Sequence, residues 1–143
     1  MILIEIIPNL YIGDIESLKY KSNLNISAII NCAKDLKSLD SYSNYVYDIK
    51  KNIEKYELIK MYQYLTESVK YIHKNITNDN SVLIYCENSN QKASTVVAAY
   101  LITYGKINLD DAIKVIRTKN KTSFYPDIDF YNALQMIDND NHG

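Results

Sequence analysis

The chain has few of the residues that cross-link a fold or interrupt its regular elements. Its 143 residues include two cysteines, three glycines, two prolines and no tryptophan. Two cysteines cannot form the disulfide framework of a small secreted domain, and the scarcity of glycine and proline excludes a low-complexity or collagen-like chain. The length suits one domain with its own hydrophobic core, so we expect residues 1–143 to form a single domain.

The chain also lacks an excess of charge and a long apolar run. Its net charge is −1 at pH 7, which gives no strong field to attract nucleic acid or an anionic membrane. No apolar run approaches the roughly 20 residues of a transmembrane helix, and residues 1–5 have neither the basic start nor the apolar length of a signal peptide. We therefore expect an intracellular protein, cytoplasmic or nuclear, with no nucleic-acid partner and no membrane partner.

Histidine is scarce, whereas tyrosine is abundant. The two histidines, His73 and His142, are far apart in the sequence, and a metal site needs three or four clustered ligands, so we expect no metal and no cofactor. The 14 tyrosines accompany many Ile, Asn and Lys residues, a bias that an AT-rich genome explains without any function. Composition therefore assigns the tyrosines no special role.

The first third of the chain is predicted to form short strands around one helix. Pro8 and Asn9 separate two apolar segments, as expected for a turn between strands. Asp14 can cap a helix over residues 15–22. The expected strands are residues 2–7, 10–12, 28–30 and 45–49.

The remaining part is predicted to be helical, with one strand within it. Apolar residues recur at spacings of four and three from Leu58 to Ile76, which predicts a long amphipathic helix. The continuously apolar residues 82–85 are typical of a central strand covered on both faces. The other expected helices are residues 92–104, ending at Gly105; a helix capped by Asn108 and extending to about residue 117; and residues 127–137. This order predicts an α/β domain with helices packed on a sheet.

A cysteine between a strand and a helix is the most informative feature of the chain. Cys86 follows strand 82–85, and a short polar loop leads from it into helix 92–104. The free N–H groups at a helix start bind anions and lower the pKa of a nearby thiol. This arrangement predicts a site for phosphate or sulfate with a cysteine nucleophile, although a buried structural thiol is the alternative. The predicted phosphate-binding loop comprises Cys86, Glu87, Asn88, Ser89, Asn90, Gln91 and Lys92.

The loop resembles the signature of the dual-specificity protein phosphatases, which belong to the cysteine-based protein tyrosine phosphatase superfamily. Their signature reads His-Cys-x-x-Gly-x-x-Arg-Ser/Thr, and residues 85–93 here read Tyr-Cys-Glu-Asn-Ser-Asn-Gln-Lys-Ala. Three further segments resemble motifs of that family in the same order along the chain. They are residues 8–13, similar to Pro-x-Leu-Tyr-Leu-Gly; residues 24–31, similar to Leu-x-Ile-Thr-x-Ile-Leu-Asn; and Pro126, Phe130 and Leu134, similar to Pro-Asn-x-x-Phe-x-x-Gln-Leu.

The resemblance implies the family's fold, in which a central, mostly parallel sheet is flanked by helices. It also implies that Cys86 and Lys92 are the residues at the catalytic positions: Cys86 at that of the nucleophile and Lys92 at that of the phosphate-binding arginine. Counting back from Cys86 places Lys55 where the family has its general-acid aspartate. Cys32 follows an apolar strand and is expected in the core.

Four signature positions differ from the family pattern: Tyr85, Ser89, Lys92 and Ala93 replace His, Gly, Arg and Ser/Thr. We therefore expect a pseudophosphatase that binds a protein or peptide carrying phosphotyrosine or phosphothreonine, or that competes with active phosphatases for a partner. Two alternatives remain open. The chain is either a weak phosphatase that uses Cys86 and Lys92, or an interaction scaffold whose loop binds nothing.

Overall fold

A computed structural model describes residues 3–20, 22–32, 55–85, 91–125 and 127–142. The strand expected at residues 45–49 lies outside this part of the chain.

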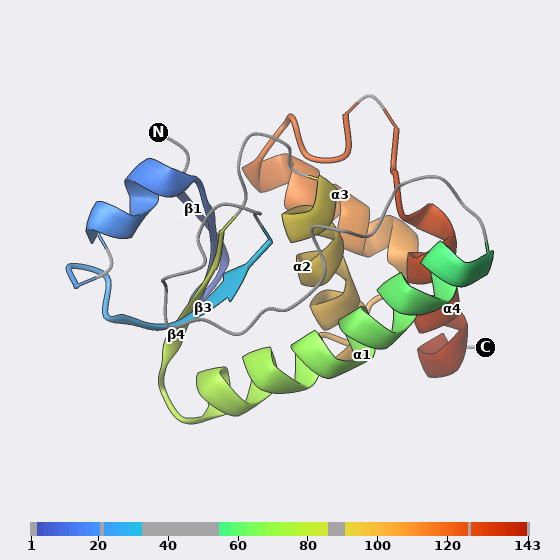
Figure 1. Ribbon diagram of the computed structural model, residues 1–143, viewed down its shortest axis with the longest axis horizontal. Coiled ribbons are helices and arrows are strands. Elements are labelled where there is room, and N and C mark those ends of the chain that lie inside the picture. Colours follow the sequence, from blue (N-terminus) through green and yellow to red (C-terminus); the bar gives the residue numbers. More distant parts are fainter. Residues whose placement is uncertain (1–2, 21, 33–54, 86–90, 126, 143) are drawn as a thin grey trace.

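The strands form a mixed sheet with β4 in an interior position (Figure 1). In the described part of the chain the order is β1-β2-β4-β3, with β1 antiparallel to β2 and the other neighbours parallel. The expected mostly parallel sheet is thus confirmed. All five residues of β4 are buried, which explains its continuously apolar sequence. The strands are β1 (Leu3–Ile7), β2 (Leu10–Gly13), β3 (Ile26–Asn31) and β4 (Ser81–Tyr85).

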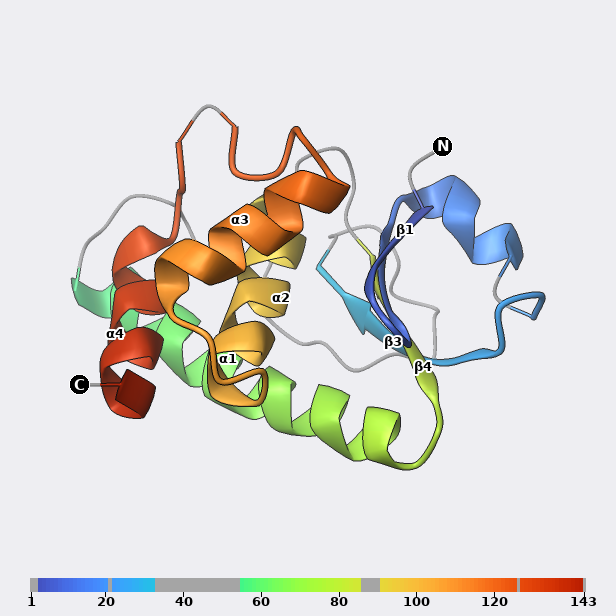
Figure 2. The ribbon, with the colours of Figure 1, turned by 180° about the vertical axis from the view of Figure 1, so that it is seen from behind.

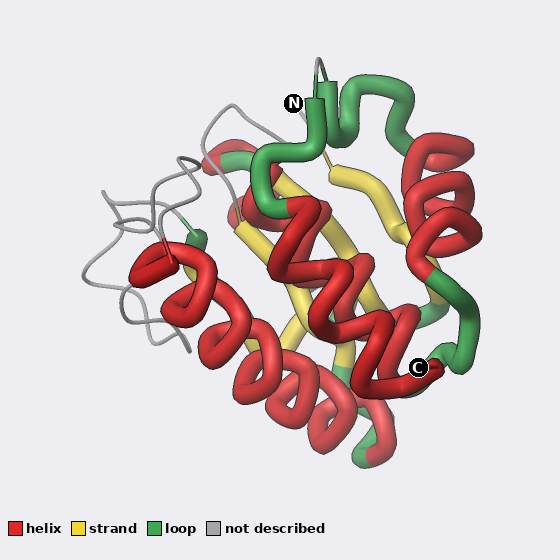
Figure 3. The backbone as a smooth tube through the Cα atoms, turned by 90° about the vertical axis from the view of Figure 1, so that its right-hand side faces the viewer, coloured by secondary structure: helices red, strands yellow, loops and turns green. Residues whose placement is uncertain are grey.

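The α-helices lie on one side of the sheet, as the view in Figure 3 shows. Because side chains alternate across a strand, Val82 and Ile84 of β4 pack toward these helices, whereas Leu83 and Tyr85 pack on the opposite face. That opposite face is covered in part by Leu18 of a short 3₁₀ helix. The helices are η1 (Ile15–Tyr20), α1 (Lys55–Thr77), α2 (Gln91–Thr103), α3 (Leu109–Lys119) and α4 (Tyr131–His142).

Helix α2 is the central helix of this layer. It packs against α1, α3 and α4, and Figure 2 shows α3 lying across it on the side away from α1. Residues 93–102 are all buried, so this helix has no solvent-facing stripe. Its small residues, such as Ala98 and Ala99, let the neighbouring helices approach closely.

Most predicted helix boundaries agree with the structure. The long amphipathic helix is α1, and the predicted helix 92–104 is α2. Asn108 caps α3 as predicted, since its side chain accepts a hydrogen bond of 2.9 Å from the Asp111 N–H. Helix α2 ends before Gly105, and the residue with left-handed backbone after it is Lys106, with φ of 62°.

Two predicted helices need correction. The helix predicted at residues 15–22 is the 3₁₀ helix η1 (Ile15–Tyr20) rather than an α-helix, although Asp14 does cap it by accepting from the Ser17 N–H at 3.3 Å. The last helix begins at Tyr131 rather than at residue 127. Its expected first residues are held outside the helix because Gln91 binds the backbone of Asp127 and Asp129.

We predict that Gly13→Ala lowers the free energy of unfolding by about 1–3 kcal/mol, the usual cost of overpacking. A Cβ atom at Gly13 would lie 2.2 Å from Oγ of Ser17 and 2.9 Å from Cδ1 of Leu83. Urea denaturation measures the effect. The control is a double-mutant cycle with Ser17→Ala, which removes the closest atom, so the two losses should not add. Strict additivity would show that this contact is not the cause.

Candidate functional site

The end of β4 and the start of α2 frame the predicted phosphate-binding loop. Tyr85 is the last residue of β4 and Gln91 is the first residue of α2. The five residues between them, Cys86, Glu87, Asn88, Ser89 and Asn90, lie outside the described part of the chain. The structure therefore tests the surroundings of the loop rather than its own geometry.

Three parallel strands end together at this edge of the sheet. Gly13 of β2 and Asn31 of β3 are both register partners of Tyr85. The next residue after β3, Cys32, donates its N–H to the Tyr85 carbonyl at 2.9 Å. The carboxyl ends of parallel strands are where open α/β sheets bind ligands. Cys32 itself is buried and packs in the core beneath the helices, which confirms the prediction for that residue.

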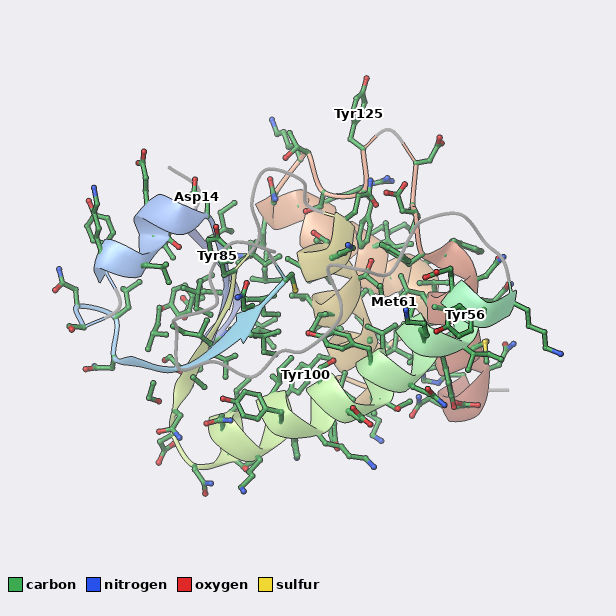
Figure 4. The ribbon with its side chains drawn as sticks, viewed as in Figure 1. Asp14, Tyr56, Met61, Tyr85, Tyr100 and Tyr125 are labelled. Atoms are coloured by element: carbon green, nitrogen blue, oxygen red, sulfur yellow. The ribbon has the colours of Figure 1, made fainter. Side chains whose placement is uncertain are left out.

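Tyr85, at the position of the family histidine, is a buried core side chain. It is 3% exposed and packs with Ile26, Ile29 and Leu83 on the face of the sheet opposite α2 (Figure 4). A phenol does not carry the positive charge that an imidazolium carries. Tyr85 therefore fills the core at this position without supplying a cation that would lower the pKa of the adjacent thiol.

Compared with the family signature, the first turn of α2 has a cation at position 92 but no hydroxyl at position 93. Lys92 is half-buried at the second position of the helix, where the resemblance places arginine. Ala93 is fully buried and has no polar group. The next two residues carry hydroxyls that bind elsewhere: Ser94 Oγ donates to Ser123 Oγ at 2.9 Å, and Thr95 Oγ1 donates to the Gln91 carbonyl at 2.6 Å. Neither hydroxyl therefore replaces the one missing at position 93.

Gln91 joins the start of α2 to the segment that precedes α4. Its Nε2 donates to the carbonyls of Tyr125 and Asp127 at 3.2 and 2.8 Å, and its Oε1 accepts from the Asp129 N–H at 3.2 Å. The side chain is buried, so these bonds satisfy both kinds of amide group in the interior. Sequence reasoning placed Gln91 only in the loop, because its partners are more than 30 residues away.

A second set of contacts fixes the residues just before Tyr125. Arg117 donates from Nε to the Ser123 carbonyl at 3.2 Å and from Nη2 to the Phe124 carbonyl at 3.3 Å. Phe124 has a fully buried ring and a φ of 65°, an unusual conformation for a bulky residue. Tyr125 follows it and is 77% exposed. The backbone is thus held on both sides of an exposed aromatic side chain.

Lys55 and the histidines considered from the sequence lie on helices α1 and α4. Lys55, at the expected place of the general acid, is the exposed first residue of α1. The ring of His73 stacks on Tyr104 with centroids 3.8 Å apart, and its Nδ1 lies 3.3 Å from the Tyr100 hydroxyl oxygen. Burial raises the pKa of the Tyr100 phenol above its ordinary value.

His142 lies in α4, with Nε2 2.9 Å from the Ile107 carbonyl oxygen. Within the described ranges, His, Cys, Asp and Glu do not gather in threes as a metal ion would require. None of the helices described here is both long and apolar enough to cross a membrane.

Comparison with known proteins gives concordant matches. The sequence model of the family described as "Dual specificity phosphatase, catalytic domain" matches residues 10–140. The chain is 28% identical over 134 residues to protein 123R of Invertebrate iridescent virus 6, which is named as a tyrosine phosphatase, covering 94% of this chain and 90% of the viral protein. It is 24% identical to human dual specificity protein phosphatase 9, covering 92% of this chain but only 35% of the human protein.

Comparison with solved structures gives a similar result. A crystal structure of a mouse protein titled as a dual specificity phosphatase, complexed with zinc tungstate, superposes with a TM-score of 0.79 at 17% identity. The match covers 96% of this chain and 87% of the mouse chain. At this identity the likeness concerns the fold.

We predict that Gln91→Ala lowers the free energy of unfolding by about 1–3 kcal/mol, because buried carbonyls lose their donor. Gln91→Glu should cost at least as much, since it places a carboxylate oxygen against two carbonyl oxygens. Urea denaturation measures stability, and hydrogen exchange should show faster exchange of the amides near Tyr125 in both variants. Gln63→Ala, at an exposed glutamine of α1, is the matched control and should stay within about 0.5 kcal/mol. Equal stability of the two alanine variants would contradict the assigned role.

Proposed function

The chain belongs to the dual specificity phosphatase family, and we propose that within this family it is a pseudophosphatase, which binds a phosphorylated protein without hydrolysing it. The observation that carries the proposal is the state of the residues flanking the loop. Tyr85 is a core residue, Ala93 is a buried alanine, and the hydroxyls of Ser94 and Thr95 are bound elsewhere. The site therefore retains groups that attract an anion while lacking groups that the reaction needs.

Anion binding depends mainly on the backbone, which these substitutions do not change. At the start of any α-helix the first N–H groups point out of the helix toward a potential anion, and the helix dipole adds partial positive charge there. Lys92 stands in the first turn of α2, where a cation opposes the dipole. A bound phosphate or sulfate would offset that repulsion.

Catalysis depends on the side chains that differ. Lysine is a point charge without the planar fork by which arginine grips two phosphate oxygens. Lys55, an exposed lysine, stands where the resemblance places the general acid, and general acid–base catalysis is typically worth about 10²–10⁴ in rate. Such effects do not multiply simply, but together they favour binding over turnover.

The proposed ligand is a protein or peptide carrying phosphotyrosine or phosphothreonine, and such binding would also let the chain compete with active phosphatases. An intracellular location follows from the same proposal, because a free thiol at Cys86 persists in a reducing compartment. The second candidate is a weak phosphatase acting through Cys86 and Lys92, which the retained cysteine and the viral relative's name favour. A scaffold that leaves the loop empty is the third candidate.

We predict that turnover of an aryl phosphate does not exceed that of the Cys86→Ser variant, because the general acid and the arginine fork are absent. A steady-state phosphatase assay measures this. Cys86-dependent hydrolysis at about 1–10³ per second, the usual range for enzymes, would overturn the pseudophosphatase proposal in favour of the second candidate.

A repaired chain provides the positive control. Tyr85→His, Ser89→Gly, Lys92→Arg and Ala93→Ser together should raise activity measurably, and Lys55→Asp should help most with poor leaving groups. A folded but inert repaired chain would show that the assignment of residues to family positions is wrong.

We also predict that phosphate stabilises the fold and that Lys92→Glu abolishes this effect. A dissociation constant of about 1 mM would give about 1.4 kcal/mol at 10 mM phosphate, a rise in Tm of about 3–6 °C. Thermal unfolding with and without phosphate measures it at constant ionic strength. Lys70→Glu, at an exposed lysine of α1, makes the same charge change elsewhere and should keep the shift. Equal shifts in all chains would place the anion at another site, and no shift in any would favour the scaffold.

A further inference from the structure

Tyr125 is the most exposed large hydrophobic side chain in the described part of the molecule. Its relative exposure is 77%, compared with 67% for Tyr56 on α1. In Figure 4 its ring points away from the body of the protein, at the end of the molecule where α2 begins. Burying such a ring against a ligand would remove a large apolar area from water.

The backbone that carries Tyr125 is fixed before any ligand binds. Its carbonyl accepts from Gln91, its N–H donates to the Thr122 carbonyl at 3.2 Å, and the two preceding carbonyls accept from Arg117. An exposed aromatic residue on an ordinary loop would lose backbone freedom on binding. Here the backbone has already lost this conformational freedom on folding, which is typical of a preorganised recognition residue.

The conformation next to Tyr125 is itself costly. Phe124 has a φ of 65°, and non-glycine residues in this region of backbone space are strained by about 1–3 kcal/mol. The buried Phe124 ring and the guanidinium of Arg117, 6.0 Å from the ring centroid, hold it in place. Strain of this kind persists only where surrounding contacts hold the backbone in one conformation. Here that conformation directs the next side chain, Tyr125, into solvent.

Gln91 ties the Tyr125 backbone to the start of α2. The same side chain that binds the Tyr125 carbonyl belongs to the residue immediately before Lys92. A phosphorylated residue bound at the start of α2 would therefore have the Tyr125 segment as a neighbour. The chemistry of an exposed phenol ring favours an aromatic partner over an aliphatic one.

We propose that Tyr125 is a specificity-determining residue whose ring packs against the ring of phosphotyrosine and so favours it over phosphothreonine. This inference rests on the proposed function, because the phosphate must sit at the start of α2. Phosphothreonine presents only a methyl group beside its phosphate and offers no ring to Tyr125. An aromatic pair contributes an amount equivalent to about a 2- to 13-fold change in affinity.

The test compares two fluorescent peptides of identical sequence that carry either phosphotyrosine or phosphothreonine. Fluorescence anisotropy measures their affinity for the unmodified chain, Tyr125→Ala, Tyr125→Phe and Tyr56→Ala, and mass spectrometry verifies that the peptides stay phosphorylated. The unmodified chain should prefer phosphotyrosine by about 2- to 13-fold. Tyr125→Ala should remove this preference by lowering the affinity for the phosphotyrosine peptide only. Tyr125→Phe and Tyr56→Ala should keep it.

Two results would overturn the inference alone: equal loss for both peptides in Tyr125→Ala, or an unchanged preference in that variant. Stabilisation by inorganic phosphate, measured on the same samples, separates these results from failure of the proposed function. Phosphate stabilisation with equal affinity for the two peptides would refute only the role of Tyr125. Absence of both phosphate stabilisation and peptide binding would refute the proposed function and this inference with it.

Discussion

The burial of α2 on all sides is the constraint on which the site depends. The sheet lies on one side of this helix and α1, α3 and α4 surround the rest, so its residues from 93 to 102 are inaccessible to solvent. Its first turn follows β4 along the chain, and β4 ends level with β2 and β3 at one edge of the sheet. A helix that is packed on all sides presents the N–H groups of its first turn in one fixed direction, which is what a backbone anion site requires.

The same burial explains how this fold accommodates Tyr85 and Ala93 at positions where the family signature has His and Ser/Thr. Tyr85 packs into the apolar face opposite the helices, and Ala93 fits the crowded start of α2. Both substitutions suit the core, so stability does not oppose them. Under the proposed function, the side chains at these positions determine turnover, whereas the backbone determines whether an anion binds.

Local sequence patterns predicted the elements well where local interactions determine them. The apolar spacing from Leu58 to Ile76 predicted α1, and the side chain of Asn108 predicted the start of α3. The predicted start of α4 was wrong, because the hydrogen bonds from Gln91 that hold the preceding residues outside the helix span 34–38 residues of sequence. No local pattern contains such contacts. The proposed role of Tyr125 could not be predicted for a related reason. Tyrosine is abundant in this chain, so one more tyrosine carries no signal. The fixed backbone of Tyr125 depends on Arg117, Gln91 and the positive φ of Phe124. The phosphate-binding loop from Cys86 to Lys92 remains a prediction, because its residues 86–90 lie outside the described part of the chain.

The strained turn at Phe124 also bears on how such a chain can vary during evolution. Gln91 and Ser94 of α2 and Arg117 of α3 come from two separate helices, yet each binds the same short stretch, residues 123–127. If one of these side chains is replaced, the remaining ones still hold the positive φ of Phe124, a conformation that the backbone would otherwise leave. These positions should therefore be replaced together or not at all among descendants of this protein. The exposed side chain of Tyr125 makes none of these contacts, so under its proposed role the ligand preference could change by a single substitution while the supporting structure stays constant.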